Sequence, residues 1–161
     1  MSALVEKALE ESLGALVSER LSEVDALVKT SIRITTAWSH SPEGEEHAVE
    51  QPSDDVTIAI AAGAPAWDQY LGPECSIPVA LTIAIRRECA PDAQALSQIM
   101  EPIANIILAL QLDVAAVEPL SSENFSADGV RVDGGNPPTL DKSTNTWRIT
   151  RSLTVRGVIC Q

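Results

Sequence analysis

The sequence predicts an α+β fold in which an antiparallel sheet of about four strands carries two α-helices on one face. Two long segments place apolar residues three and four positions apart, and four short segments alternate apolar with polar or small residues. Most consecutive strands are joined without an intervening helix, which favours antiparallel pairing. A chain of 161 residues suits one domain. We therefore expect a single domain over residues 1–161, with long loops at about 39–55 and 113–146.

Residues 2–27 have the pattern of an amphipathic helix. Glutamates lie mostly on the side opposite the apolar stripe, and Ser2 is a suitable N-cap. Gly14 is expected to weaken the middle of the helix because glycine has low helix propensity. The apolar stripe consists of Val5, Leu9, Leu13, Leu16, Val17, Leu21, Val24 and Leu27.

The next two strands are separated by an acidic stretch. "TSIRITTAW", residues 30–38, places Ile32, Ile34 and Trp38 on one face. Residues 39–55 contain Pro, Gly and Ser with many acids and no periodicity, which predicts an exposed loop longer than ordinary connections. "VTIAIAA", residues 56–62, then alternates branched residues with small uncharged ones.

The third strand, within "SIPVALTIAIRRE" at 76–88, carries an unusual outer face. Its odd-numbered residues are Ile, Val and Leu, which predicts a face against the core. Pro78, Ala80, Thr82 and Ala84 alternate with them and carry no charge. We expect a neighbouring subunit or the 113–146 segment to cover these four residues.

Helical spacing returns after Cys89. Pro91 and Asp92 suit the first turn, whereas Pro102 is expected to kink or divide the helix because proline lacks a backbone donor. Residues 113–146 are polar and rich in turns, with one short strand expected at "GVRVD". The last strand is expected over 145–158, with Trp147, Ile149, Leu153 and Val155 inward.

The charge balance excludes most nucleic-acid binders. The chain has 11 basic and 23 acidic residues, a net charge of −12, and the acidic excess lies mainly in the first half. Such a surface repels DNA, although it suits a channel through which DNA slides. No apolar run approaches the roughly 18 residues of a membrane span. Two alternatives stay open for the arginines of the C-terminal half, a dock for an acidic partner and a solvated face with local ion pairs.

The sequence favours no catalytic or metal centre, and no cofactor is expected. His40 and His47 lie beside acids in the predicted loop, which offers no preorganised ligand geometry. Cys89 follows Arg86 and Arg87, an environment that can lower a thiol pKa, but an inert residue is the more common outcome. "DGGNPP", residues 133–138, lacks the strand and helix that flank a phosphate-binding loop.

The order of elements resembles a family of phage proteins. A helix, a strand, an acidic insertion, "VTIAIAAG", a Trp-containing loop, "CSIPVALTIAIRR", "PDAQALSQIMEPIANIIL" and a late strand follow one another. This series resembles the tail-terminator, tail-completion and head–tail joining proteins of tailed bacteriophages. The resemblance implies a subunit without catalytic residues that forms a ring, often of six copies, at the tail end or neck of a virion.

Three functional hypotheses follow. The leading one is a virion structural protein, a tail terminator or neck component assembled in the host cytoplasm, whose partners are other copies and tail-tube or portal-proximal proteins. The second is a cytoplasmic binding module that uses a groove near Trp67 and Tyr70, and the third is an enzyme dependent on Cys89. The expected assembly contacts are Pro78, Ala80, Thr82, Ala84, Trp67, Tyr70, Glu43, Glu45, Glu46, Arg148, Arg151 and Arg156.

Overall fold

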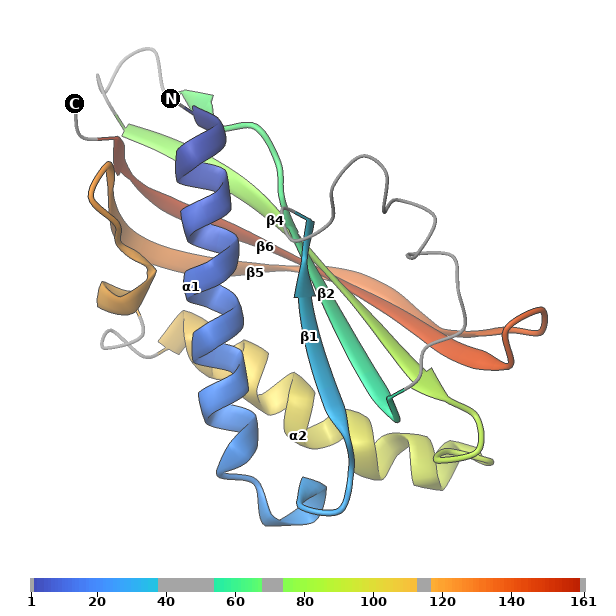
Figure 1. Cartoon of the computed structure of the whole chain (residues 1–161). Coiled ribbons are helices and arrows are strands. Elements are labelled where there is room, and N and C mark those ends of the chain that lie inside the picture. The colour runs from blue at the N-terminus through green and yellow to red at the C-terminus, as the bar shows by residue number, and fades with distance from the viewer. Residues whose placement is uncertain (1, 38–53, 68–73, 113–116, 160–161) are drawn as a thin grey trace.

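A mixed six-stranded sheet carries two helices on one face (Figure 1). The computed structural model describes residues 2–37, 54–67, 74–112 and 117–159. The sheet order is β1-β2-β4-β6-β5, and β3 pairs with β4 outside this path. The elements are α1 (Ser2–Ser22), η1 (Asp25–Leu27), β1 (Ile32–Thr36), β2 (Val56–Ala62), β3 (Ala66–Trp67), β4 (Glu74–Arg86), α2 (Ala93–Leu112), η5 (Glu118–Leu120), β5 (Phe125–Asp141) and β6 (Thr146–Ile159). The predicted α+β class is confirmed, but the sheet has more than four strands.

One correction concerns strand direction, because β1 and β2 are parallel. Ile34 lies beside Ile58, and the N–H of Val56 donates to the carbonyl of Ser31 at 3.0 Å. Parallel neighbours need a crossover of a dozen or more residues. The stretch 37–55 is long enough to return the chain to the same end of the sheet. The expectation of a loop at 39–55 falls largely on 38–53, outside the described residues.

The helix α1 lies across β1 and β2, and two of its residues depart from expectation. Gly14 does not interrupt the helix, and a Cβ built on it would lie 3.4 Å from Ile34 Cγ2 and 3.7 Å from Ile60 Cδ1. Glycine therefore permits close approach of the helix to both strands. Glu10, expected mostly on the solvent side, is fully buried, and its carboxylate accepts a hydrogen bond from the N–H of Ala62 at 3.1 Å.

The helix α2 closes the core from the other end of the same face (Figure 1). Asp92 caps it, because its Oδ1 accepts the N–H of Ala95 at 2.8 Å. Pro102 lies inside the continuous helix and does not divide it, since packing of its apolar stripe offsets one lost hydrogen bond. The buried stripe is Leu96, Ile99, Met100, Ile103, Ile107 and Leu110.

The apolar content of α2 also corrects the expectation about membrane spans. By length and composition alone, α2 is long and apolar enough to cross a membrane. Its stripe is buried against the sheet in this fold, which gives its apolar residues a place in the core.

Within residues 117–146, a 17-residue strand, β5, occupies much of the predicted loop and contains the short strand expected at "GVRVD". β5 pairs antiparallel with β6 along its length, interrupted by irregularities between Ala127 and Gly129, between Val132 and Gly134, and between Asn136 and Thr139. Because this strand lies at the sheet edge and is largely exposed beyond Val132, it has no clean alternation. Its polar, turn-rich composition therefore suggested a loop.

The start of β5 is held by its only aromatic residue. Phe125 is 1% exposed and lies over Gly157 of β6, where a Cβ would come within 2.6 Å of the phenyl ring. Glycine opposite an aromatic ring is thus required by close packing at this position.

Candidate functional site

The face of the sheet opposite the helices is the first candidate surface. Pro78 and Ala80 of β4 are exposed there and Thr82 is half-buried, whereas Ala84 is only 6% exposed. Ala84 is buried because it lies between Thr57 of β2 and Arg148 of β6. Three of the four predicted contacts are therefore accessible in the isolated chain.

Small and hydroxyl side chains extend this surface over neighbouring strands. Ala59 and Ala61 lie beside Thr82 and Ala80 on β2. Thr150 and Ser152 lie beside the same two residues on β6. The described part of 113–146 does not lie over them, because β5 joins the sheet edge instead, so that expected cover is wrong for residues 117–146.

The three arginines predicted on this surface do not share one face. Arg148 and Arg156 occupy outward positions of β6. Arg151 pairs with Leu81, a core-facing residue, and therefore lies on the helix-bearing face. Its guanidinium donates to the carbonyl oxygens of Asn136 and Thr150 at 3.0 and 2.9 Å.

Local ion pairs involve four arginines of β4, β5 and β6. The nearest nitrogen–oxygen distances are 3.3 Å for Arg148–Asp141, 4.0 Å for Arg156–Glu74, 2.6 Å for Arg131–Asp133 and 2.7 Å for Arg86–Glu88. The Ser143 hydroxyl and then the Arg148 guanidinium lower the pKa of the Asp141 carboxyl to about 2. Of the two sequence alternatives, these contacts favour the solvated face with local ion pairs over a basic dock.

The loop residues predicted as contacts are only partly described. Trp67 of β3 is 53% exposed and pairs with Cys75 of β4. Tyr70 and the acidic residues Glu43, Glu45 and Glu46 lie outside the described residues, as do His40 and His47. Trp67 lines neither of the two hollows described below.

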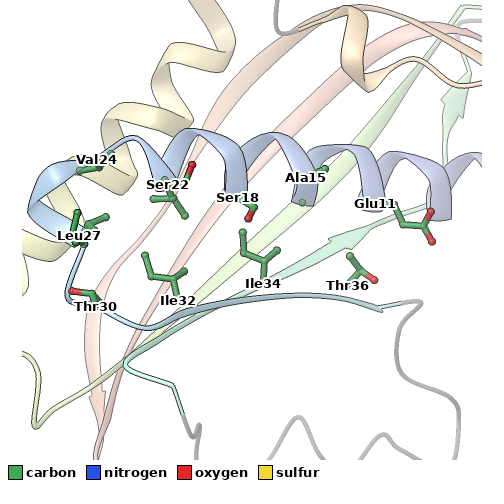
Figure 2. A pocket seen from close by; sticks show the side chains of 13 residues that line it. Glu11, Ala15, Ser18, Ser22, Val24, Leu27, Thr30, Ile32, Ile34 and Thr36 are labelled. Carbon is green, nitrogen blue, oxygen red and sulfur yellow. The ribbon is translucent and has the colours of Figure 1, made fainter.

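A groove between α1 and β1 was not predicted from the sequence (Figure 2). It has a volume of about 680 Å³. Its helical wall carries Ala15, Ser18 and Ser22, and its strand wall carries Ile32 and Ile34. The signal that could have revealed it is the run of small residues along one flank of an otherwise acidic helix.

A second hollow of about 910 Å³ lies between α2 and the turn that contains η1. Its lining includes the charged residues Arg20, Lys29, Asp55 and Glu101, together with Cys89. Charged and apolar groups around one hollow are typical of small-molecule sites.

The Cys89 thiol at this hollow has no features of a nucleophile. Its Sγ donates to Asp55 Oδ1 at 3.0 Å. Burial and then this hydrogen bond raise its pKa to about 11, and the attraction of Arg86 is too weak to reverse them. The raised pKa agrees with the expectation of an inert residue, because burial and the Asp55 carboxylate outweigh the attraction of Arg86.

Asp55 links Ser31, which precedes β1, to the end of β4 and the turn that follows it. Its Oδ2 accepts the N–H of Ser31, its own N–H donates to the Ser31 hydroxyl, and its carbonyl accepts the N–H of Arg86. The Cys89 hydrogen bond and then that of Ser31 lower the pKa of its carboxyl. Among residues 2–37, 54–67, 74–112 and 117–159, no group of three or more potential metal ligands occurs.

Comparison with known proteins gives a likeness of fold. No family model matches the chain, and no curated protein matches it. A solved chain from the structure titled "Virion of native gene transfer agent (GTA) particle" superposes with a TM-score of 0.55 and 16% sequence identity. The match covers 91% of this chain and 94% of that chain. The two chains therefore share one fold over nearly their whole lengths.

Proposed function

We propose that this protein is a structural subunit of a phage-like virion. The observation that carries the proposal is the likeness of fold, over 91% of the chain, to a chain of a gene transfer agent virion. The sheet face on which Pro78 and Ala80 are exposed and the groove beside β1 provide surfaces for assembly. The raised pKa of the Cys89 thiol argues against the cysteine-dependent enzyme.

Within a virion, we propose the role of a tail terminator or head–tail connector that forms a ring. The resemblance to the tail-terminator and head–tail joining proteins suggests six copies in this ring. A ring requires a heterologous interface, in which one surface of a subunit meets a different surface of the next. The outward face of β2, β4 and β6 supplies one flat surface of small residues, suited to close approach. The net charge of −12 suits a channel that DNA passes without binding.

The test combines imaging with binding to virion parts. The purified protein is imaged by negative stain alone and with tail tubes or portal assemblies of a virion whose genome encodes it. Rings at the tube end or portal support the role. Monomers at high concentration that bind neither assembly would contradict it.

The specific test of the flat face is Ala80→Arg, which places a large charge where a neighbouring subunit is expected. The matched control is Ala104→Arg on α2, a half-buried alanine outside that face. Loss of ring assembly in Ala80→Arg alone, with unchanged thermal stability, supports this interface. Equal ring assembly by both variants would show that the ring interface lies on another surface.

A binding module remains the second candidate because of the 910 Å³ hollow with Arg20, Lys29, Asp55 and Glu101. Thermal-shift measurements with a library of small anionic and zwitterionic metabolites test it. A saturable shift that Lys29→Ala abolishes, together with absence of rings, would favour this function over the virion role.

A further inference from the structure

Two Asp-Gly pairs lie in β5. Within "SADGVRVDGG", residues 126–135, Asp128 precedes Gly129 and Asp133 precedes Gly134. The pairing of β5 with β6 is irregular at both places. Glycine after an aspartate leaves the aspartate carboxyl open to attack by the next backbone nitrogen, because no side chain on the glycine hinders the approach. The same local chemistry therefore occurs twice in one strand, and the surroundings of each pair decide its outcome.

The carboxylate of Asp133 is held on both of its oxygens. Its Oδ1 accepts a hydrogen bond from Arg131 Nε at 2.6 Å, and its Oδ2 accepts one from the Thr154 hydroxyl. Thr154 is 8% exposed, so this donor is fixed within the sheet. The Thr154 hydroxyl and then the Arg131 guanidinium lower the pKa of the Asp133 carboxyl. Both the position and the charge of this carboxylate are thus unfavourable for attack by the Gly134 nitrogen.

The side chain of Asp128 has none of these restraints. It is exposed, and it has no hydrogen bond or ion pair with another described residue. Asp128 is the extra residue of the first irregularity, because the ladder with β6 passes directly from Ala127 to Gly129. A bulged residue lies outside the regular ladder, so less of the sheet has to open before its backbone can rotate.

The glycine that follows Asp128 also has room around it. Nothing lies within 4 Å of a Cβ added to Gly129. The backbone at this pair can therefore rearrange without displacing a neighbouring side chain. The two Asp-Gly pairs consequently differ in the freedom of the carboxylate, although their sequences are the same.

We propose that Asp128 is a site of spontaneous isoaspartate formation, whereas Asp133 is protected by its hydrogen bonds. The Gly129 nitrogen bonds to Cγ of Asp128, and the carboxyl oxygen that leaves departs with the proton of that nitrogen as water. The product is a five-membered succinimide. Water then adds to the main-chain carbonyl carbon and breaks its bond to nitrogen, so that the chain continues through the side chain. One water leaves and one returns, and no oxidant or other reactant is needed.

Isoaspartate would change the main chain at the start of β5. It adds one carbon to the backbone between Ala127 and Val130, which are 9% and 8% exposed and belong to the core. The net charge is unchanged, because one carboxylate replaces another. We therefore expect the modified chain to unfold more easily than the unmodified one. This inference goes beyond the proposed function and does not rest on it.

The first experiment ages the full-length protein and maps both pairs. Folded protein is kept for weeks in a mildly acidic buffer, in which part of the aspartate side chains are neutral and therefore reactive. Trypsin cleaves after Arg131, so the two pairs are recovered in different peptides. Isoaspartate has the same mass as aspartate, so each peptide is scored by an isoaspartyl-specific methyltransferase and by electron-transfer fragmentation.

We expect at least about tenfold more isoaspartate at Asp128 than at Asp133, because charge-assisted hydrogen bonds must break before Asp133 can react. The control is the same chain unfolded in guanidinium chloride. There the two pairs are expected to react at comparable rates, which assigns the difference to the folded structure.

Two variants test the reasons for this difference. Thr154→Val removes one donor to Asp133 and should raise isoaspartate there at least about fivefold, with no change at Asp128. Gly129→Ala should lower isoaspartate at Asp128 several-fold, because the new methyl group hinders the attacking nitrogen. The open space around Gly129 allows this variant to fold, and Asp133 serves as its internal control.

Three outcomes would overturn the proposal. The first is equal isoaspartate at both pairs of the folded protein. The second is isoaspartate at neither pair under conditions that convert the unfolded chain, since the fold would then protect both. The third is an equal rise at both pairs in Thr154→Val, which would show general loosening of β5 and not the release of one carboxylate. None of these results bears on ring formation at a virion.

Discussion

The two edges of the sheet differ in how their backbone groups are hydrogen-bonded and in how regular their strands are. At the β5 edge, the N–H of Val132 donates to Gln111 Oε1 at 2.8 Å, and the N–H of Ala127 donates to the Ser121 hydroxyl at 3.0 Å. Three irregularities and the pair Pro137 and Pro138 interrupt the same strand. At the β1 edge, the short strand has no bulge, and no hydrogen bond from a described residue to the backbone groups of Ile32 and Ile34 occurs.

This contrast indicates where another polypeptide can be added. Two backbone donors of β5, those of Val132 and Ala127, bond to side chains of the same chain, and its prolines have no donor to offer. A continuous sheet formed by joining β5 of one copy to β1 of the next is therefore disfavoured. The open edge and its groove make β1 the border suited to strand addition.

The largest expected effect tests how strongly β5 is anchored. Phe125→Ala should lower the free energy of unfolding by about 4 kcal/mol, because it leaves a cavity at a side chain that is 1% exposed. Ile34→Ala, at a half-buried residue of β1, should lower the free energy of unfolding by clearly less. Urea unfolding of both variants measures the difference, and equal losses would remove the contrast between the edges.

A smaller effect is expected where β5 and β6 approach most closely. In Gly157→Ala the new Cβ would clash with the Ser126 carbonyl oxygen and would lie 2.6 Å from Phe125. We expect destabilisation of about 2 kcal/mol through overpacking. Gly129→Ala is the control on the same hairpin, since nothing lies within 4 Å of its added Cβ. If Gly129→Ala lowered the free energy of unfolding as much as Gly157→Ala, overpacking would not explain the effect.

Loss of the side-chain hydrogen bond at the β5 edge should lower the free energy of unfolding by about 1 kcal/mol. Gln111→Ala removes the acceptor for the Val132 N–H, and exposed Gln94→Ala on the same helix is the control. Faster exchange of the Val132 amide, together with greater aggregation of Gln111→Ala alone, would make β5 resemble β1. Unchanged exchange at Val132 would show that the side-chain bond does not protect this edge.

The smallest effect is a pH dependence at the β1 end of the sheet. The pKa of Asp55 is lowered in the folded chain from an ordinary value of 3.8, so the unfolded state binds more protons near that pH. Its contribution to stability is present above pH 3.8 and is lost as the pH falls through the lowered pKa. Asp55→Asn should flatten the acid limb of the stability curve measured in urea.

The matched variant for that measurement lies on the β5–β6 hairpin. Asp141 has a pKa of about 2, lowered first by the Ser143 hydroxyl. Asp141→Asn should flatten the curve between pH 3.8 and about 2. An acid limb identical to that of the unmodified protein in both variants would show that neither carboxyl controls acid unfolding.

The candidate surfaces were predicted only in part. Alternation along one strand was enough to place Pro78 and Ala80 on the outward face, because side-chain direction has a period of two. Alternation could not predict that Ala84 is buried, since Thr57 and Arg148 on neighbouring strands cover its side chain. The groove beside β1 arises from two elements together, and the small residues on one flank of α1 do not by themselves show that β1 lies beside them.

The sequence by itself determined the local elements. Periodicity alone predicted α1, α2, β1, β2, β4 and β6 to within a few residues, because burial of one face imposes a spacing that can be read along the chain. It also predicted the α+β class, since the number and order of such segments limit how layers can form.

Only the tertiary structure decided the rest. The parallel direction of β1 and β2, the edge position of β5 and the burial of Glu10 all depend on which distant segments become neighbours. Arg151 is on the helix-bearing face for the same reason, because its register is set opposite Leu81. Pairing between strands is a long-range choice, and no local spacing encodes which edge of the sheet remains open.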